Sequence, residues 1–401
     1  MYQIKPQLFY YAISMRISNR LPDNFAPNSL AELLNQMRGA SIPILDLTIS
    51  NPTACGIDYP QDAITSALAN PQVLHYKPDP KGMERARAAI SEMHGHGLNP
   101  ESIQLTASTS EAYSMLFKLL ADPGDNIIAQ SPGYPLIEWL ARLEGINCKT
   151  IPAFWHDGWN PDIDAMDRAC DSKTRAIVIV NPNNPTGRFL TETEWPRLLE
   201  LATAKNLPLI VDEVFANYPL EHQEGAIRTV LDVPTPACPV FLLSGLSKVA
   251  ALPQLKLGWI AMLGAAGSAT EPLAFIADQY LSVSAATAHA TPQLLAIAPE
   301  LQTQVKNRLG GNLRILDNTL KAHPHLTRHP VYGGWSVLIQ QPDIEGDESC
   351  TLRLLSDFHL FIYPGHFFDI PKKGFLVASL LPEPDTFKSA ANVLAEGLKL
   401  R

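Results

Sequence analysis

Short apolar segments alternate along the middle of this chain with longer segments of helical periodicity. The strand-like segments are bounded in several places by Gly, Pro, Asn or Asp, and they span residues 126–130, 175–180, 207–212, 239–243 and 255–262. Helix-period stretches lie between them, at 134–144, 161–169 and 192–205. This alternation predicts an α/β fold, in which helices sandwich a mostly parallel sheet on both faces.

The pattern changes after about residue 290. A long helix is predicted over 294–322, followed by strand-like pieces at 335–339 and 375–380. The chain has 401 residues, more than the ~250–300 at which a single hydrophobic core stops growing. We therefore predict a large domain over 45–290 and a smaller α+β domain over 291–401. The N-terminal arm and helix, residues 1–44, would join the smaller domain.

Charge and composition exclude several classes of partner. A net charge of -9, without a run rich in Lys or Arg, argues against nucleic acid. No apolar run approaches the ~20 residues of a membrane helix, and the apolar patch at 8–13 is short and has no convincing cleavage site. The five cysteines include no CxxC pair, and the histidines lack cysteine or acidic partners at a ligand spacing. We expect a cytoplasmic protein without a metal, whose partners are small molecules or a second copy of itself.

Two polar residues follow predicted strands directly. Asp212 ends the apolar run that begins at Leu207, and Asn184 lies in a Pro-rich turn, 181–187, after the strand at 175–180. Ligands of parallel sheets bind beyond the carboxyl ends of the strands. A buried aspartate needs a cationic partner, and a rigid turn can hold one amide donor. Taken alone, each also has a structural explanation, Asp212 as a helix cap or loop carboxylate and Asn184 as an ordinary turn residue.

An anion site and a lysine complete this set. The segment 106–112 precedes a helical pattern, so its hydroxyls and free amides would bind an anion, although a plain Ser/Thr cap is the alternative. Lys248 comes just after the strand at 239–243 and Lys256 follows it; either alone could simply be solvated. A Schiff-base lysine, a carboxylate for a ring nitrogen, an amide for a ring hydroxyl and an anion cradle are the groups that pyridoxal phosphate needs.

The same segments resemble those of a known family. From about Ile44 to Leu380 the chain resembles the fold-type I pyridoxal-phosphate enzymes, specifically the class I and II aminotransferases, which have the fold of aspartate aminotransferase. The matching motifs are individually weak to moderate and are strong in this order: Tyr76-Lys-Pro-Asp-Pro-Lys-Gly82, Thr106 to Ala112, Pro123 to Tyr134, Asn181 to Gly187, Asp212-Glu213 and Ser247-Lys248.

The resemblance implies a role for each matched residue. Lys248 would carry pyridoxal 5'-phosphate as a Schiff base and then shuttle the substrate's proton, and Asp212 would keep the ring nitrogen protonated. Asn184 would donate to the ring oxygen and Tyr134 would stack on the ring. The other cofactor-binding positions that the resemblance implies are Ala107, Ser108 and Thr109 at the phosphate, Phe215, Ser247 and Lys256, and Tyr76 reaching the neighbouring subunit's phosphate. The implied protein is a homodimer that moves an amino group from a small-molecule amino donor to a keto or aldehyde acceptor.

Two cofactor positions depart from the family pattern. Phe215 stands three residues after the aspartate, where the family has a tyrosine, so the ring oxygen loses one donor and we expect the pKa of the cofactor–lysine linkage to be raised. Lys256 stands where the family has an arginine, which keeps the charge and gives up the planar fork. We expect the cofactor to bind nonetheless.

A third departure concerns the substrate. In the predicted strand Gly374 to Ser379, the place of the arginine that binds the substrate's carboxylate falls by register on Val377. Either Arg328 or Arg353 substitutes for it, or the amino donor is not an ordinary α-amino acid, or the register is different. For the same reason a decarboxylase, a carbon–sulfur lyase and a non-catalytic scaffold that binds the cofactor stay open beside the transaminase.

Overall fold

The computed structural model, which describes residues 17–234 and 236–399, contains one large sheet of seven strands. All of its strands are parallel except β8, which runs antiparallel to both of its neighbours. The order across the sheet is β2 (Ile103–Thr106), β8 (Gly258–Leu263), β7 (Val240–Gly245), β6 (Leu209–Asp212), β5 (Thr174–Val180), β3 (Asn126–Ser131) and β4 (Asn147–Pro152). The predicted α/β fold, with a mostly parallel sheet between helices, is confirmed.

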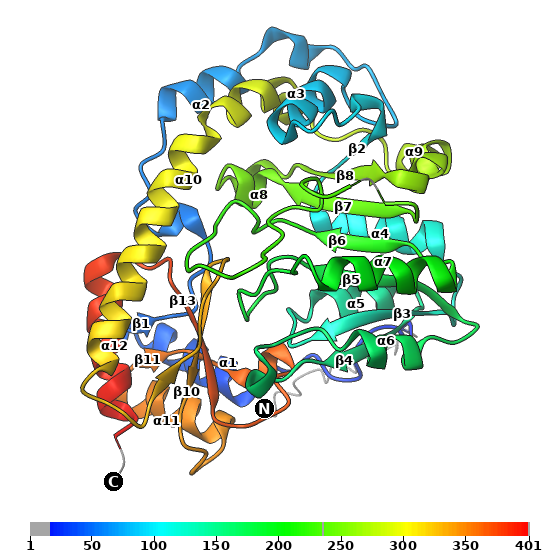
Figure 1. Ribbon diagram of the computed structural model, residues 1–401. Coiled ribbons are helices and arrows are strands. Elements are labelled where there is room, and N and C mark those ends of the chain that lie inside the picture. Colours follow the sequence, from blue (N-terminus) through cyan, green and yellow to red (C-terminus); the bar gives the residue numbers. More distant parts are fainter. Residues whose placement is uncertain (1–16, 235, 400–401) are drawn as a thin grey trace, which may run out of the picture.

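Both faces of this sheet are covered by helices (Figure 1). Alternate residues of one strand point to opposite faces, so Ile177 and Ile179 of β5 join one apolar core while Ala176 and Val178 join another. The second core contains α4 (Thr109–Leu120), α5 (Leu136–Leu143) and α9 (Thr270–Asp278). The first contains α3 (Glu84–His94), α6 (Ile163–Ala169), α7 (Glu194–Lys205), the short α8 (Leu246–Val249) and the beginning of α10 (Ala285–Leu320).

A second, smaller sheet lies beside the first. Its four strands are β12 (Tyr363–Pro364), β13 (Phe375–Ser379), β10 (Ser336–Gln340) and β9 (Thr327–Arg328), in that order and antiparallel. Helix α10 runs from α2 (Gln61–Leu68) and α3 at one end to α12 (Pro384–Gly397) at the other (Figure 1). The early segments α1 (Ser29–Gly39) and β1 (Leu45–Asp46) contact α11 (Asp347–Phe358) and β11 (Leu360–Phe361). The predicted boundary at residue 290 falls inside α10, and the division into domains stays a prediction.

Several element boundaries differ from those predicted. The strand expected from 255 begins only at Gly258, because Pro253–Leu255 form a 3-10 turn and Lys256 adopts a left-handed backbone conformation with φ of 50°. The long helix begins nine residues earlier than expected, since Ser284 caps it. Strands β2 and β4 were not expected at all. Strand β4 lies at the sheet edge and exposes Asn147 and Pro152, so its sequence lacks the apolar run of a central strand.

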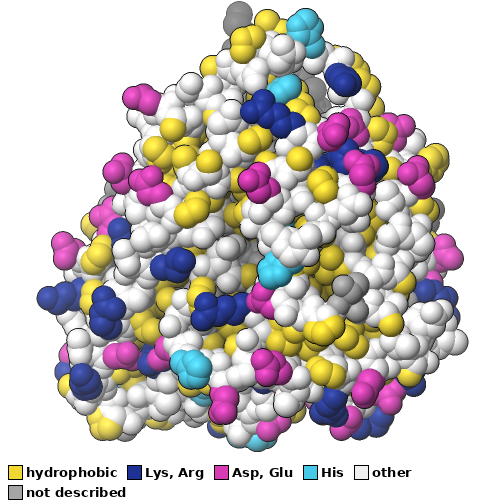
Figure 2. Space-filling model, turned by 45° about the horizontal axis from the view of Figure 1, so that its top comes forward, with side chains coloured by type: hydrophobic (Ala, Val, Ile, Leu, Met, Phe, Trp, Pro, Cys, Tyr) yellow, Lys and Arg dark blue, Asp and Glu magenta, His cyan; other side chains and the backbone are white. Residues whose placement is uncertain are grey.

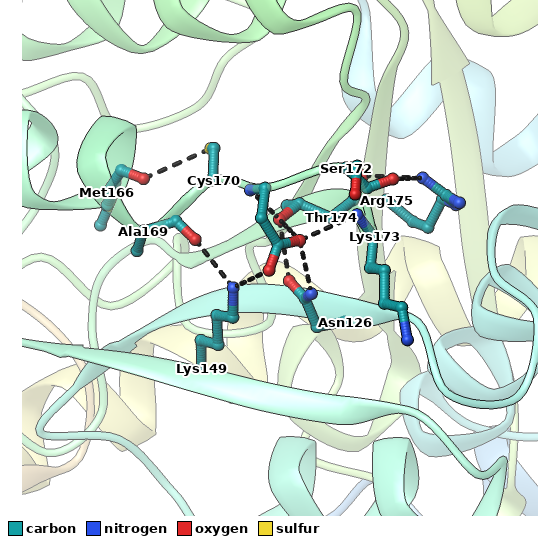
Figure 3. A network of polar contacts seen from close by, with 10 residues as sticks. Asn126, Lys149, Met166, Ala169, Cys170, Ser172, Lys173, Thr174 and Arg175 are labelled. Atoms are coloured by element: carbon teal, nitrogen blue, oxygen red, sulfur yellow. Dashed lines mark hydrogen bonds and ion pairs between the residues drawn. The ribbon is translucent and has the colours of Figure 1, made fainter.

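Polar contacts to Asp171 tie together three neighbouring strands through Asn126, Lys149 and Thr174, which Figure 3 labels. Lys149 of β4 donates to its Oδ2 at 2.7 Å, Asn126 of β3 donates to its Oδ1 at 2.9 Å, and Thr174 of β5 contacts the same Oδ1 at 3.2 Å. The hydrogen bonds from Lys149 and Asn126 hold the pKa of Asp171 well below its usual range. This network is structural, because the polar ends that can bind a ligand lie at the opposite edge of the sheet.

The surface carries charges of both signs. On the face shown in Figure 2, acidic and basic side chains are interspersed, with hydrophobic side chains showing between them. Among the described helices, none is both long enough and apolar enough to cross a membrane. The apolar patch at 8–13 and most of the predicted N-terminal arm lie outside the described residues.

Candidate active site

A cavity of about 270 Å³ opens where the carboxyl ends of β5 and β6 meet α8 and the smaller sheet. Val180 and Asp212 reach it from the two strand ends, and Ser336 and Val377 reach it from β10 and β13. Parallel sheets bind ligands at this edge. Seven of the predicted site residues line the cavity together: Thr109, Tyr134, Asn184, Asp212, Phe215, Ser247 and Lys248.

Asp212 is the buried carboxylate of the cavity. Its side chain accepts hydrogen bonds from the Val214 amide at 3.0 Å and from the Tyr113 hydroxyl at 3.0 Å. Burial raises the pKa of Asp212 to about 6, while these two hydrogen bonds and the charge of Lys248 act to lower it. The carboxylate is therefore mostly ionised at neutral pH, and it can hold a cationic group of a ligand.

Lys248 is the cavity's amine. Burial lowers the pKa of Lys248 to about 8, although the nearby carboxylate of Asp212 acts in the opposite direction and raises it. The Nζ atom lies 4.4 Å from the ring centre of Trp335 and 5.3 Å from that of Phe215. A sizeable fraction of this amine is neutral near physiological pH, as a nucleophilic lysine requires.

The amino end of α4 provides the anion cradle. Ser108 caps the helix, because its hydroxyl accepts from the Glu111 amide at 3.2 Å, and Thr109 is the first helical residue. Gly258 of β8 approaches this turn so closely that a Cβ there would lie 2.9 Å from the Ser108 carbonyl carbon and 3.0 Å from the Thr109 nitrogen. The Ala107 amide is already bonded to the Glu111 carboxylate. The helix end therefore offers dipole, hydroxyls and amides to a phosphate group.

Hydrogen bonds of the preceding residue fix the turn that carries Asn184. Asn183 is buried, donates to the Pro132 carbonyl at 3.0 Å and accepts from Thr186, which fixes the turn. Asn184 Oδ1 accepts a long hydrogen bond of 3.4 Å from the Ser336 hydroxyl. This contact leaves the amide nitrogen of Asn184 as the group that can donate to a ring oxygen.

Four predicted cofactor residues lie outside the lining of this cavity. Ala107 and Ser108 directly precede Thr109 in the α4 cradle. Lys256 is exposed, one turn after Pro253. Tyr76 is 77% exposed and lines a different hollow together with Leu74 and His289. An exposed Tyr76 is compatible with its predicted contact to a neighbouring subunit, and the roles of all four stay predictions.

Three residues near the reacting groups were not expected from the sequence. Tyr113 holds Asp212, and Tyr218 donates its hydroxyl to the Lys248 carbonyl. Trp335 packs edge-on against both Phe215 and Tyr218 and faces Lys248. The spacing of Tyr113, four residues after Thr109 and so on the same helix face, was the one available signal.

These groups fit pyridoxal phosphate. A buried aspartate can pair with a pyridinium nitrogen, a lysine of lowered pKa shares its cavity, and Gly258 keeps space beside an anion-binding helix end. A seven-stranded sheet of this kind with such a site defines a fold-type I pyridoxal-phosphate enzyme.

Comparison with known proteins identifies the family. The family model described as "Aminotransferase class I and II" matches residues 43–378, and the chain belongs to this family, whose members use pyridoxal 5'-phosphate. The chain is 26% identical over 374 residues, 88% of its length and 90% of the relative's, to the glutamate-pyruvate aminotransferase AlaA of Haemophilus influenzae. It is 29% identical over 211 residues, 50% of its length and 44% of the relative's, to an S-alkyl-thiohydroximate lyase of Arabidopsis thaliana.

A solved structure agrees on the fold. A single mutant of Thermus thermophilus aspartate aminotransferase superimposes with a TM-score of 0.83 at 22% identity, covering 96% of this chain and 100% of that one. The match to the family model and the curated relatives confirm the predicted family, cofactor and pyridoxal-phosphate-dependent aminotransferase activity.

Proposed function

We propose that this aminotransferase works through Lys248 and Asp212, with the end of α4 holding the cofactor's phosphate. The observation that carries this assignment is the shared cavity, in which a lysine of lowered pKa and a buried carboxylate lie together with Thr109 and Asn184. When bound, pyridoxal phosphate supplies an electron sink for the carbon that bears the amino group.

Each residue then has a defined task. Asp212 holds a proton at the pyridine nitrogen, and Tyr113 orients that carboxylate. Lys248 binds the cofactor and moves the substrate's proton at its Nζ. Asn184 donates to the ring oxygen, and Tyr134, 54% exposed at the cavity wall, covers the ring.

Borohydride trapping tests the assignment of the lysine. The purified protein is incubated with pyridoxal phosphate, reduced and digested, and the modified peptide is identified by mass spectrometry. We expect the label on Lys248 and its loss in Lys248→Arg, while Lys256→Arg keeps the label. A label on another lysine of the wild-type protein contradicts the assignment.

A carbon–sulfur lyase is the second candidate, favoured by the similarity to the Arabidopsis lyase. A lyase releases a thiol from a thioether substrate without passing an amino group to an added keto acid. A thiol assay run beside an assay for the new amino acid separates the two reactions.

The homodimer is also a proposal, supported by exposed apolar side chains. Leu74 is 83% exposed, Tyr76 77% and Leu281 63%, and Phe275 on α9 is 70% exposed. Side chains of this kind in one region are typical of an interface. Light scattering is expected to give twice the chain mass of 44.0 kDa. We further propose a cytoplasmic location, which cell fractionation can test.

A further inference from the structure

Among the described residues that line it, the cavity at Lys248 offers no free cation to a carboxylate. Within the described part of the chain, the charged residues that line it are Asp212 and Lys248, and Lys248 is the group that the proposed function assigns to the cofactor. The other lining side chains are apolar, aromatic, hydroxyl or amide groups. A carboxylate entering here would lose its water and gain no opposite charge, which is strongly unfavourable.

The cavity wall formed by β13 is apolar at Val377, the position where the family resemblance places the carboxylate-binding arginine. Val377 is 2% exposed, lines the cavity, and pairs with Leu338 of β10 and with Tyr363 of β12. Ser379, two residues further along the strand, lines the cavity as well, so this face of β13 presents a valine and a hydroxyl to a ligand. Val377 therefore lies on the side of β13 that faces the cavity.

Arg328 and Arg353 were the two candidates for the arginine that binds the substrate's carboxylate, and neither takes that role. Arg328 is held by Asp317, with Nε to Oδ1 at 2.6 Å, and by Glu221 at 2.9 Å. Arg353 pairs with Glu345. Neither lines the cavity.

Arg38 is a third arginine to consider. It acts electrostatically on Tyr363, which lines the cavity. Its guanidinium contacts the Asp46 carboxylate at 3.4 Å, so its charge already has a partner.

Trp335 provides a different recognition group. Its indole is 2% exposed, and its Nε1 atom is buried without a hydrogen-bond partner among the described residues. The tryptophan lines the cavity and its ring lies 4.4 Å from Lys248 Nζ. The nitrogen is buried, so Trp335 offers a ligand the apolar surface of its ring. Tyr363 and Phe368 line the same cavity and provide apolar area.

Building on the proposed aminotransferase function, we propose that the amino donor is a primary amine without a free carboxylate. Its apolar part packs against the aromatic side chains. The donor gives up its amino group and becomes a ketone or aldehyde whose oxygen comes from water. The amino group then passes to the keto or aldehyde acceptor, which releases one water.

A pair of ligands that differ mainly in charge tests this inference. L-phenylalaninamide and L-phenylalanine are titrated into the protein loaded with pyridoxal phosphate, and binding is followed by the absorption of the cofactor. We expect the amide to bind at least about tenfold more tightly. Equal or tighter binding of the amino acid, or a loaded protein that responds to neither ligand, overturns this inference alone. Failure to trap the cofactor on Lys248 overturns the proposed function as well.

Variants locate the recognition groups. Val377→Arg is expected to reverse the preference toward L-phenylalanine, and Val377→Leu to leave it unchanged. Arg38→Ala should leave the preference unchanged. If Arg38→Ala selectively weakens L-phenylalanine, Arg38 supplies the missing charge and the inference fails.

Discussion

Replacing Phe215 by tyrosine should lower the pKa of the cofactor–lysine linkage. Phe215 lines the cavity with Asn184 and Asp212, and its ring contacts Trp335 edge-on at 5.5 Å. The added hydroxyl extends into the same cavity and can donate to the ring oxygen. A hydrogen bond to a charged group contributes about 1.5–3 kcal/mol. At ~1.36 kcal/mol for each pKa unit, the deprotonated linkage gains enough to lower its pKa by about 1 to 2.

An optical pH titration measures this change directly, because the two protonation states of the linkage absorb differently. The linkage of the wild-type protein is expected to titrate above neutral pH. In Phe215→Tyr its pKa should be clearly lower than in the wild type. Phe215→Leu serves as the matched control, since it alters the ring and adds no donor. A wild-type linkage already deprotonated near neutrality, or an unchanged pKa in Phe215→Tyr, refutes the reasoning.

Three further predictions concern the surroundings of the site. Tyr113→Phe removes a hydrogen bond to buried Asp212, which should raise the pKa of this carboxyl above its present value of about 6. Cofactor binding should then weaken about tenfold at neutral pH. An unchanged dissociation constant for the cofactor contradicts this prediction. Gly258→Ala places a methyl group against the α4 cradle and should weaken cofactor binding. Gly267→Ala should not, because its added Cβ would have no neighbouring atom within 4 Å. Burial raises the pKa of Glu213 from its ordinary 4.5 to about 8. Between pH 4.5 and pH 8, Glu213 is therefore protonated in the folded chain and ionised in the unfolded chain. Stability should therefore fall as pH rises from about 4.5 to 8, by at most ~1.4 kcal/mol for each pH unit, and urea unfolding of Glu213→Gln should show a weaker fall than wild type.

Sequence patterns predicted the central strands well and the edge strand poorly. Strands β5 and β6 lie within two residues of their predicted positions, because a strand buried on both faces reads as a continuous apolar run. Strand β4 escaped prediction because an edge strand exposes polar residues such as Asn147 and Thr150 to solvent. Of the site, Lys248 and Asp212 could be predicted because strand ends of a parallel sheet converge on one edge.

The sequence by itself determined the alternation of strands and helices, the order of the cofactor motifs and the departures at Phe215 and Val377. These are local properties, since periodicity and motif spacing are written along the chain. Only the tertiary structure decided that Tyr113 supports Asp212 and that the ring of Trp335 lines the cavity beside Lys248. The contact between Tyr113 and Asp212 joins residues 99 positions apart, and the packing of α4 on the large sheet, which no short segment encodes, brings them within bonding distance.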